Sequence, residues 1–135
     1  MEERIGRGIV TGIIAGAVCG IGMIALNNLT GAFNFESSLK HNLVAFAIGG
    51  ALFGMLSGVI VSLVSGYLPF GKVANAVIVS VVVWTLLRTV GAGLVGLDPF
   101  RFHSDISQTY QGLGFSILLG VVLGFALKSG GRKTA

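Results

Sequence analysis

The segment 8–20, GIVTGIIAGAVCG, places a glycine at every fourth position. Residues four apart lie on the same face of an α-helix, so Gly8, Gly12, Gly16 and Gly20 would form one continuous ridge. In water such a helix would be unstable, because each glycine costs about 1 kcal/mol relative to alanine. In lipid the backbone has no water to bond with, so the helix forms, and the ridge lets a second helix approach closely.

The same spacing recurs in two further apolar stretches. These ridges consist of Gly50, Gly54 and Gly58, and of Gly112, Ser116, Gly120 and Gly124. The pattern predicts a compact bundle of membrane helices packed as a glycine zipper through small-xxx-small contacts. Three ridges offer more close-packing surface than one four-helix bundle needs, so we expect part of this surface to contact partner helices.

The composition predicts an all-α integral membrane protein with one domain. The chain has 135 residues, of which 53% are hydrophobic and only 10% are charged, whereas a soluble domain has about 25% charged residues. At about 20 residues per crossing, four crossings occupy nearly the whole chain. The expected spans are 8–26, 43–64, 73–92 and 111–127, followed by a basic tail over 128–135.

The positions of the basic residues predict the orientation in the membrane. Six lysines and arginines lie at the termini and in the short turn after residue 64, and only two lie in the long connections. By the positive-inside rule, both termini are expected on the cytoplasmic side of an inner (plasma) membrane. Because these residues flank apolar stretches, the net charge of +4 indicates topology signals rather than a nucleic-acid partner.

The first 25 residues are expected to remain as a membrane helix. Glu2 and Glu3 offset the positive charges of Arg4 and Arg7. The apolar run over 8–26 also exceeds the 7–15 residues that are typical of a cleaved signal peptide.

An internal repeat suggests that two helical hairpins arose by duplication, related by an axis along the membrane normal. A glycine and two alternating phenylalanines follow a leucine in both long connections, and chance similarity in a glycine-rich sequence is the alternative explanation. The matching residues are Leu29, Gly31, Phe33 and Phe35 in the first, and Leu94, Gly96, Phe100 and Phe102 in the second.

Arg88 is the one charged residue inside an expected span. A charge at the bilayer centre costs at least about 2.5–3.5 kcal/mol, which makes such a residue a functional candidate. In one interpretation Arg88 binds an anion, a lipid phosphate or an acidic partner residue. In the other, the helix ends near Val90 and Arg88 extends to the headgroups.

Other residues give weaker indications of chemistry. His41 and His103 are expected in the two long connections, on the same side of the membrane, where they could contact a partner or ligand such as a haem, a pigment or a metal. They lack the spacing of a metal site, so no cofactor is predicted, and specific binding of a lipid or pigment has no support in the sequence. Cys19, the single cysteine, is expected to be a small buried apolar residue.

Two functions remain open at this level. No carboxylate falls inside an expected span, and no nucleophile–base pair is present, so catalysis is not expected. The first hypothesis is a non-catalytic accessory subunit that packs against other transmembrane helices of a larger complex and against membrane lipids. The alternative is a homo-oligomeric channel or transporter for a small solute or anion that uses Arg88.

Overall fold

The computed structural model describes residues 1–31, 38–97 and 106–130, which form an all-helical chain. Its helices are α1 (Glu2–Thr30), α2 (Leu39–Val64), α3 (Lys72–Leu97) and α4 (Ile106–Gly130). All four are long and apolar enough to cross a membrane. The expectation of four apolar helices is therefore confirmed, and this architecture is typical of a multi-pass membrane protein.

The helices extend beyond the expected spans. Helix α1 passes the expected end at residue 26 and continues to Thr30. Its C-cap is Gly31, whose φ of 63° is left-handed and whose N–H donates to the Asn27 carbonyl oxygen at 2.7 Å. Glycine adopts this conformation without the steric cost of a side chain, which explains why the helix stops there. Helix α4 begins at Ile106 rather than near residue 111, so part of the expected second connection is helical.

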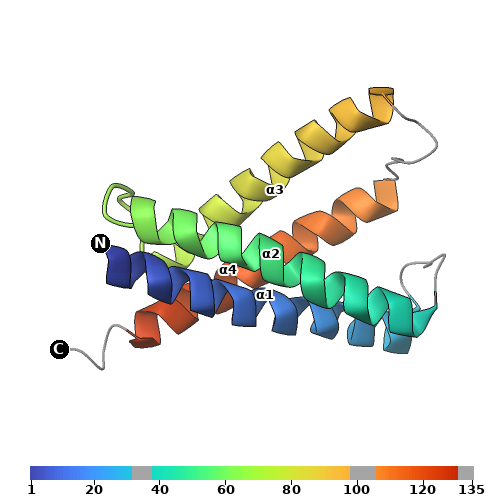
Figure 1. Cartoon of the computed structure of the whole chain (residues 1–135), viewed down its shortest axis with the longest axis horizontal. Coiled ribbons are helices and arrows are strands. Elements are labelled where there is room, and N and C mark those ends of the chain that lie inside the picture. Colours follow the sequence, from blue (N-terminus) through green and yellow to red (C-terminus); the bar gives the residue numbers. More distant parts are fainter. Residues whose placement is uncertain (32–37, 98–105, 131–135) are drawn as a thin grey trace.

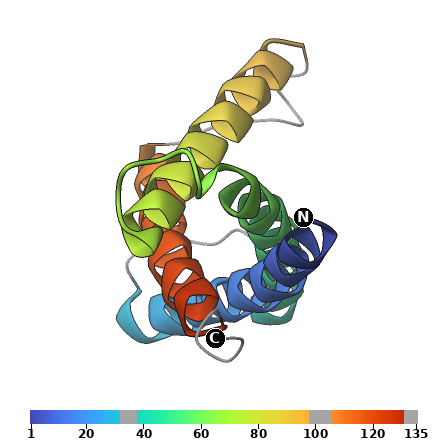
Figure 2. The same ribbon diagram turned by 90° about the vertical axis from the view of Figure 1, so that its left-hand side faces the viewer.

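The helices form two antiparallel hairpins that cross each other. Figure 1 shows α1 and α2 side by side along their length, with α3 and α4 running obliquely to them. The hairpins meet at the end of the bundle that carries the short turn 65–71, here called the turn end. Toward the opposite end, called the far end, α3 leaves the other helices (Figures 1 and 2), so the bundle is less compact than the ridges predict.

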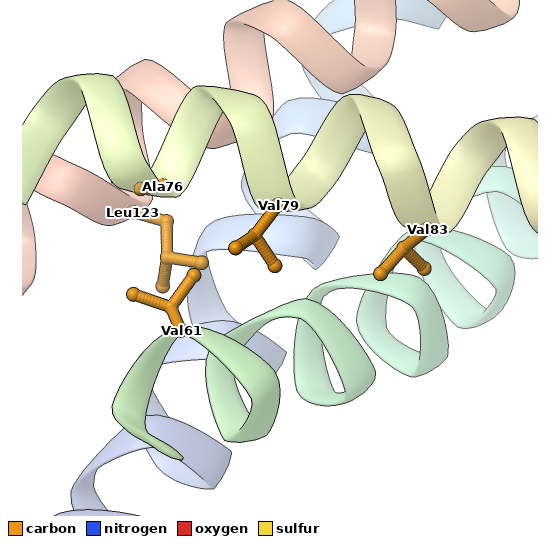
Figure 3. Close-up of a cluster of buried hydrophobic side chains, with 5 residues drawn as sticks. All are labelled: Val61, Ala76, Val79, Val83 and Leu123. Atoms are coloured by element: carbon orange, nitrogen blue, oxygen red, sulfur yellow. The ribbon is translucent and has the colours of Figure 1, made fainter. Parts of the chain in front are cut away.

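Two apolar clusters join the hairpins. The first consists of Val61, Ala76, Val79, Val83 and Leu123, from α2, α3 and α4. Figure 3 shows Val61, Val79 and Leu123 pointing toward one another.

The second cluster consists of Ala15, Cys19 and Leu119, from α1 and α4. Phe53 packs against both clusters, and its ring lies 5.8 Å from that of Phe115 between centroids. The buried core is therefore small and lies where the hairpins cross.

The outer surface of the helices is apolar. Val10, Ile14 and Val18 of α1 are each about 60% exposed (58%, 59% and 61%). A helix that is apolar on its outer face as well as its inner face is expected in a membrane rather than in water.

Candidate functional site

The glycines of α1 and α2 face each other in register. Pairs form between Gly8 and Gly58, between Gly12 and Gly54, and between Gly16 and Gly50. In each pair, a Cβ atom added to either glycine would overlap the carbonyl oxygen of the other. We call these pairs the α1–α2 seam.

The approach at this seam is close enough to exclude any side chain. A Cβ added at Gly16 would lie 2.6 Å from the carbonyl carbon of Gly50, and a Cβ added at Gly12 would lie 2.7 Å from the carbonyl carbon of Gly54. Real Cβ atoms essentially never make contacts under 3.0 Å. Gly20 continues the row against the backbone of Phe46. Alanine at these positions would therefore force the two helices apart.

Glycines outside the ridges do not share this constraint. Gly22 of α1 and Gly49 of α2 have no atom of the described residues within 4 Å of an added Cβ, apart from their own helix backbone and chain neighbours. The close approach thus follows the four-residue spacing, and glycine content alone does not produce it.

The α4 ridge meets α3, which has larger side chains. An added Cβ at Gly112 would overlap the indole nitrogen Nε1 of Trp84. Gly120 lies against the backbone of Val77, and Gly124 lies against the backbone of Val73. We call this the α3–α4 seam.

The expectation of a spare ridge for partner helices is therefore wrong. The α1 and α2 ridges face each other, and the α4 ridge packs against α3 of the same chain. Any partner must contact another surface.

Arg88 lies within α3, half-buried, one turn beyond Trp84. The helix continues to Leu97, past the helix end near Val90 that the second interpretation of Arg88 assumes, while the stretch that is apolar enough to cross a membrane covers Lys72–Val90. Arg88 also makes at least one interaction with another group in the structure.

Of the two histidines, His41 is the one that the structure describes. His41 lies in the first turn of α2 rather than in a connection, where its backbone N–H donates to the Ser38 hydroxyl at 3.3 Å. This serine is the N-cap, a residue type preferred at helix starts. His103 lies outside the described residues. Within the described ranges, no group of three or more His, Cys, Asp or Glu residues could hold a metal ion.

Several buried polar side chains were not singled out by the sequence analysis. Among the described residues, Ser57 Oγ, Asn75 Oδ1, Ser80 Oγ and Gln111 Nε2 have no hydrogen-bond partner. The Asn75 amide nitrogen donates to the Leu68 carbonyl oxygen at 3.5 Å and so connects the short turn to α3. The sequence signal that could have identified them is a polar residue within an apolar stretch.

Comparison with known proteins does not place the chain in a family. No family model matches it, and neither the curated proteins nor the solved structures contain a significant match.

Proposed function

We propose that this protein is a non-catalytic membrane subunit that packs against transmembrane helices of a larger complex in the inner membrane. The supporting observation is the uncovered part of α3. The stripe Ala76, Val79 and Val83 is buried, but Leu86 and Val90, which continue it with the same alternating spacing of three and four residues, are 61% and 63% exposed. This spacing is typical of helix–helix packing, and α3 stands apart from the other helices there (Figure 2).

The two seams make each hairpin a preformed unit. In lipid, helix association depends on close van der Waals packing rather than on the hydrophobic effect. The α1–α2 seam supplies that packing over three successive glycine pairs, which supports its role as a glycine zipper. A hairpin held in this way can present its outer face to a partner without rearrangement.

The contacts also support a duplicated hairpin. Aligned by position, Gly8, Gly12, Gly16 and Gly20 of α1 correspond to Lys72, Ala76, Ser80 and Trp84 of α3, although Gly124 and Gly120 lie nearest to Val73 and Val77, one residue further along. Phe46, Gly50, Gly54 and Gly58 of α2 take the place of Gly112, Ser116, Gly120 and Gly124 of α4. In one pair the glycine lies on the other helix of the hairpin. Gly20, on the first helix of its hairpin, faces Phe46, whereas Gly112, on the second helix of its hairpin, faces Trp84.

The junction between the hairpins follows the same correspondence. Ala15 and Cys19 of α1 correspond to Val79 and Val83 of α3, and all four residues are buried between the hairpins. Phe53 of α2 corresponds to Leu119 of α4, and both pack there. The pattern favours a pseudo-twofold axis along the membrane normal over chance similarity.

A direct test is purification of the tagged protein from its native membrane in mild detergent, followed by native mass measurement. We expect a species that contains additional polypeptides. Recovery of only a monomer of 13.9 kDa would contradict the proposal.

The second candidate function, a homo-oligomeric channel or transporter for a small solute or anion, is favoured by the half-buried Arg88 within α3. Its test is anion flux in liposomes for wild type and Arg88→Ala. Flux that depends on Arg88 would displace the accessory role, and absence of flux would leave the accessory role as the better account.

A further inference from the structure

Basic residues of three helices gather around the short turn at the turn end. Arg4 of α1 donates a hydrogen bond from Nη2 to the hydroxyl oxygen of Ser65, the first residue of the turn, at 3.1 Å. Lys72 begins α3 directly after the turn. An added Cβ at Gly124 of α4 would lie 3.3 Å from the Lys72 carbonyl oxygen, and Lys128 lies one turn beyond Gly124 on the same face. We call Arg4, Lys72 and Lys128 the basic rim.

The basic rim lies in one plane of the molecule. All three of its residues are exposed. Figure 1 shows the start of α1, the short turn and the end of α4 at the same end of the bundle. Because the four apolar helices are long enough to cross the bilayer, this end lies at the level of the lipid headgroups. Residues that act on a headgroup layer need to share this level only, so the rim does not have to converge on one point.

The charge at the basic rim has a positive excess. Glu2 and Glu3 are the two acidic residues among the described ranges, and both belong to the first turn of α1. Glu3 lies 3.9 Å from the guanidinium of Arg7, so its charge is offset within α1. Glu2 then remains against the three positive charges of the rim.

The turn inside the basic rim carries exposed aromatic side chains. Tyr67 is 88% exposed and Phe70 is 57% exposed. The backbone N–H of Tyr67 donates to the Val64 carbonyl oxygen at 2.9 Å, and the amide nitrogen of Asn75 donates to the carbonyl oxygen of Leu68 at 3.5 Å. These bonds tie the turn to α2 and α3. Tyrosine is enriched at membrane–water interfaces, where its ring meets the apolar layer and its hydroxyl meets the headgroups.

We propose that the basic rim binds the phosphate groups of anionic lipids, so that the protein prefers anionic to zwitterionic lipid at its turn end. Guanidinium and ammonium groups form charge-assisted hydrogen bonds with phosphate oxygens. Each basic residue near an anionic lipid surface strengthens the attraction about fivefold, which corresponds to about 1 kcal/mol. A zwitterionic headgroup carries its own ammonium group beside the phosphate, which weakens its attraction for the rim.

The test is a lipid titration of the intact protein in mild detergent. Phosphatidylglycerol or phosphatidylcholine with the same acyl chains is added stepwise, and native mass measurement records the bound lipid at each concentration. We expect the apparent Kd for phosphatidylglycerol to be at least about tenfold lower than that for phosphatidylcholine. Higher ionic strength should reduce this preference, because salt screens exposed charges.

Variants connect the preference to the basic rim. Each of Arg4→Gln, Lys72→Gln and Lys128→Gln is expected to raise the Kd for phosphatidylglycerol about fivefold, with little change for phosphatidylcholine. Arg4→Lys keeps the charge and should keep the preference. Lys40→Gln is the matched control, because it removes an exposed positive charge at the start of α2, at the far end, and should leave the preference nearly unchanged. Circular dichroism checks folding.

Equal affinity of the wild type for the two lipids would overturn the proposal, and so would an equal loss of preference in Lys40→Gln and in the three rim variants. This titration does not depend on partner subunits. Its failure would therefore leave the accessory role intact, and a monomeric native mass would leave the lipid preference intact.

Discussion

Gly16 of α1 and Gly50 of α2 lie so close that neither position has room for a side chain. An added Cβ at Gly16 would lie 2.6 Å from the Gly50 carbonyl carbon, and one at Gly50 would lie 3.0 Å from the Gly16 carbonyl carbon. The constraint is therefore reciprocal. Each of the two glycines is needed because the other helix's backbone occupies the space, which accounts for glycines in a helix that would be unstable in water.

The α3–α4 seam predicts that Gly112→Leu displaces the Trp84 indole. The isobutyl group would occupy the position of the indole nitrogen edge. We expect destabilisation by about 1–3 kcal/mol, as is typical of overpacking, together with a shift of the Trp84 emission maximum. Gly114→Leu is the control on the same helix, because no atom of the described residues outside its own helix backbone and chain neighbours lies within 4 Å of an added Cβ there. An equal shift in both variants would be inconsistent with the seam.

The crossing of the hairpins predicts a specific cross-link. Cys19 and Leu119 belong to one buried cluster although they lie on different hairpins. We expect Leu119→Cys to form an intramolecular disulfide with Cys19 under mild oxidation, read as a loss of two hydrogens in the intact mass. Leu118→Cys, whose residue is 41% exposed on the same helix, should not form it. Cross-linking at 118 but not at 119 would refute the arrangement.

The distribution of basic residues predicts that the short turn lies on the cytoplasmic side. In a Cys19→Ser background, Tyr67→Cys in the turn should react with a membrane-impermeant maleimide only after the cells are opened. Leu39→Cys, at the start of α2, should react in intact cells if the reagent reaches the outer face of the membrane. Tyr67 is 88% exposed and Leu39 is 50% exposed, so access does not limit either reaction. The reverse pattern would invert the topology.

The four helices could be predicted from the sequence because each rests on a long local signal. The apolar stretches over 8–26 and 43–64 are longer than 18 residues and are bounded by polar or turn-forming residues, which is sufficient to predict spans. The short turn was located for the same reason, since Pro69 and two glycines interrupt the apolar pattern.

The pairing of the ridges could not be predicted, because it depends on three-dimensional register. Spacing shows which residues share a face of a helix, but it does not show which helix that face meets. The contact between Trp84 and Gly112 joins a large residue to a small one from separate stretches, and no local pattern marks it. Spacing alone therefore predicts a spare ridge for partner helices, whereas the ridges pack against helices of the same chain.

The polar residues within the helices show a similar limit. Arg88 was conspicuous as a charge in an apolar stretch, but Gln111 lay at the edge of its expected span and had no distinguishing spacing. Its significance comes from burial together with an unpartnered Nε2, and both are properties of the packed helices.

The most direct test of the seam is the free energy of unfolding of Gly16→Ala and Gly22→Ala, measured in the same detergent. Both changes replace glycine by alanine in α1, so any gain in helix propensity is shared between them. Only Gly16 faces a backbone. The account predicts that Gly16→Ala unfolds more easily than the wild type by about 1–3 kcal/mol, while Gly22→Ala is unchanged or slightly more stable. Equal stabilities for the two variants would contradict the close approach of α1 and α2.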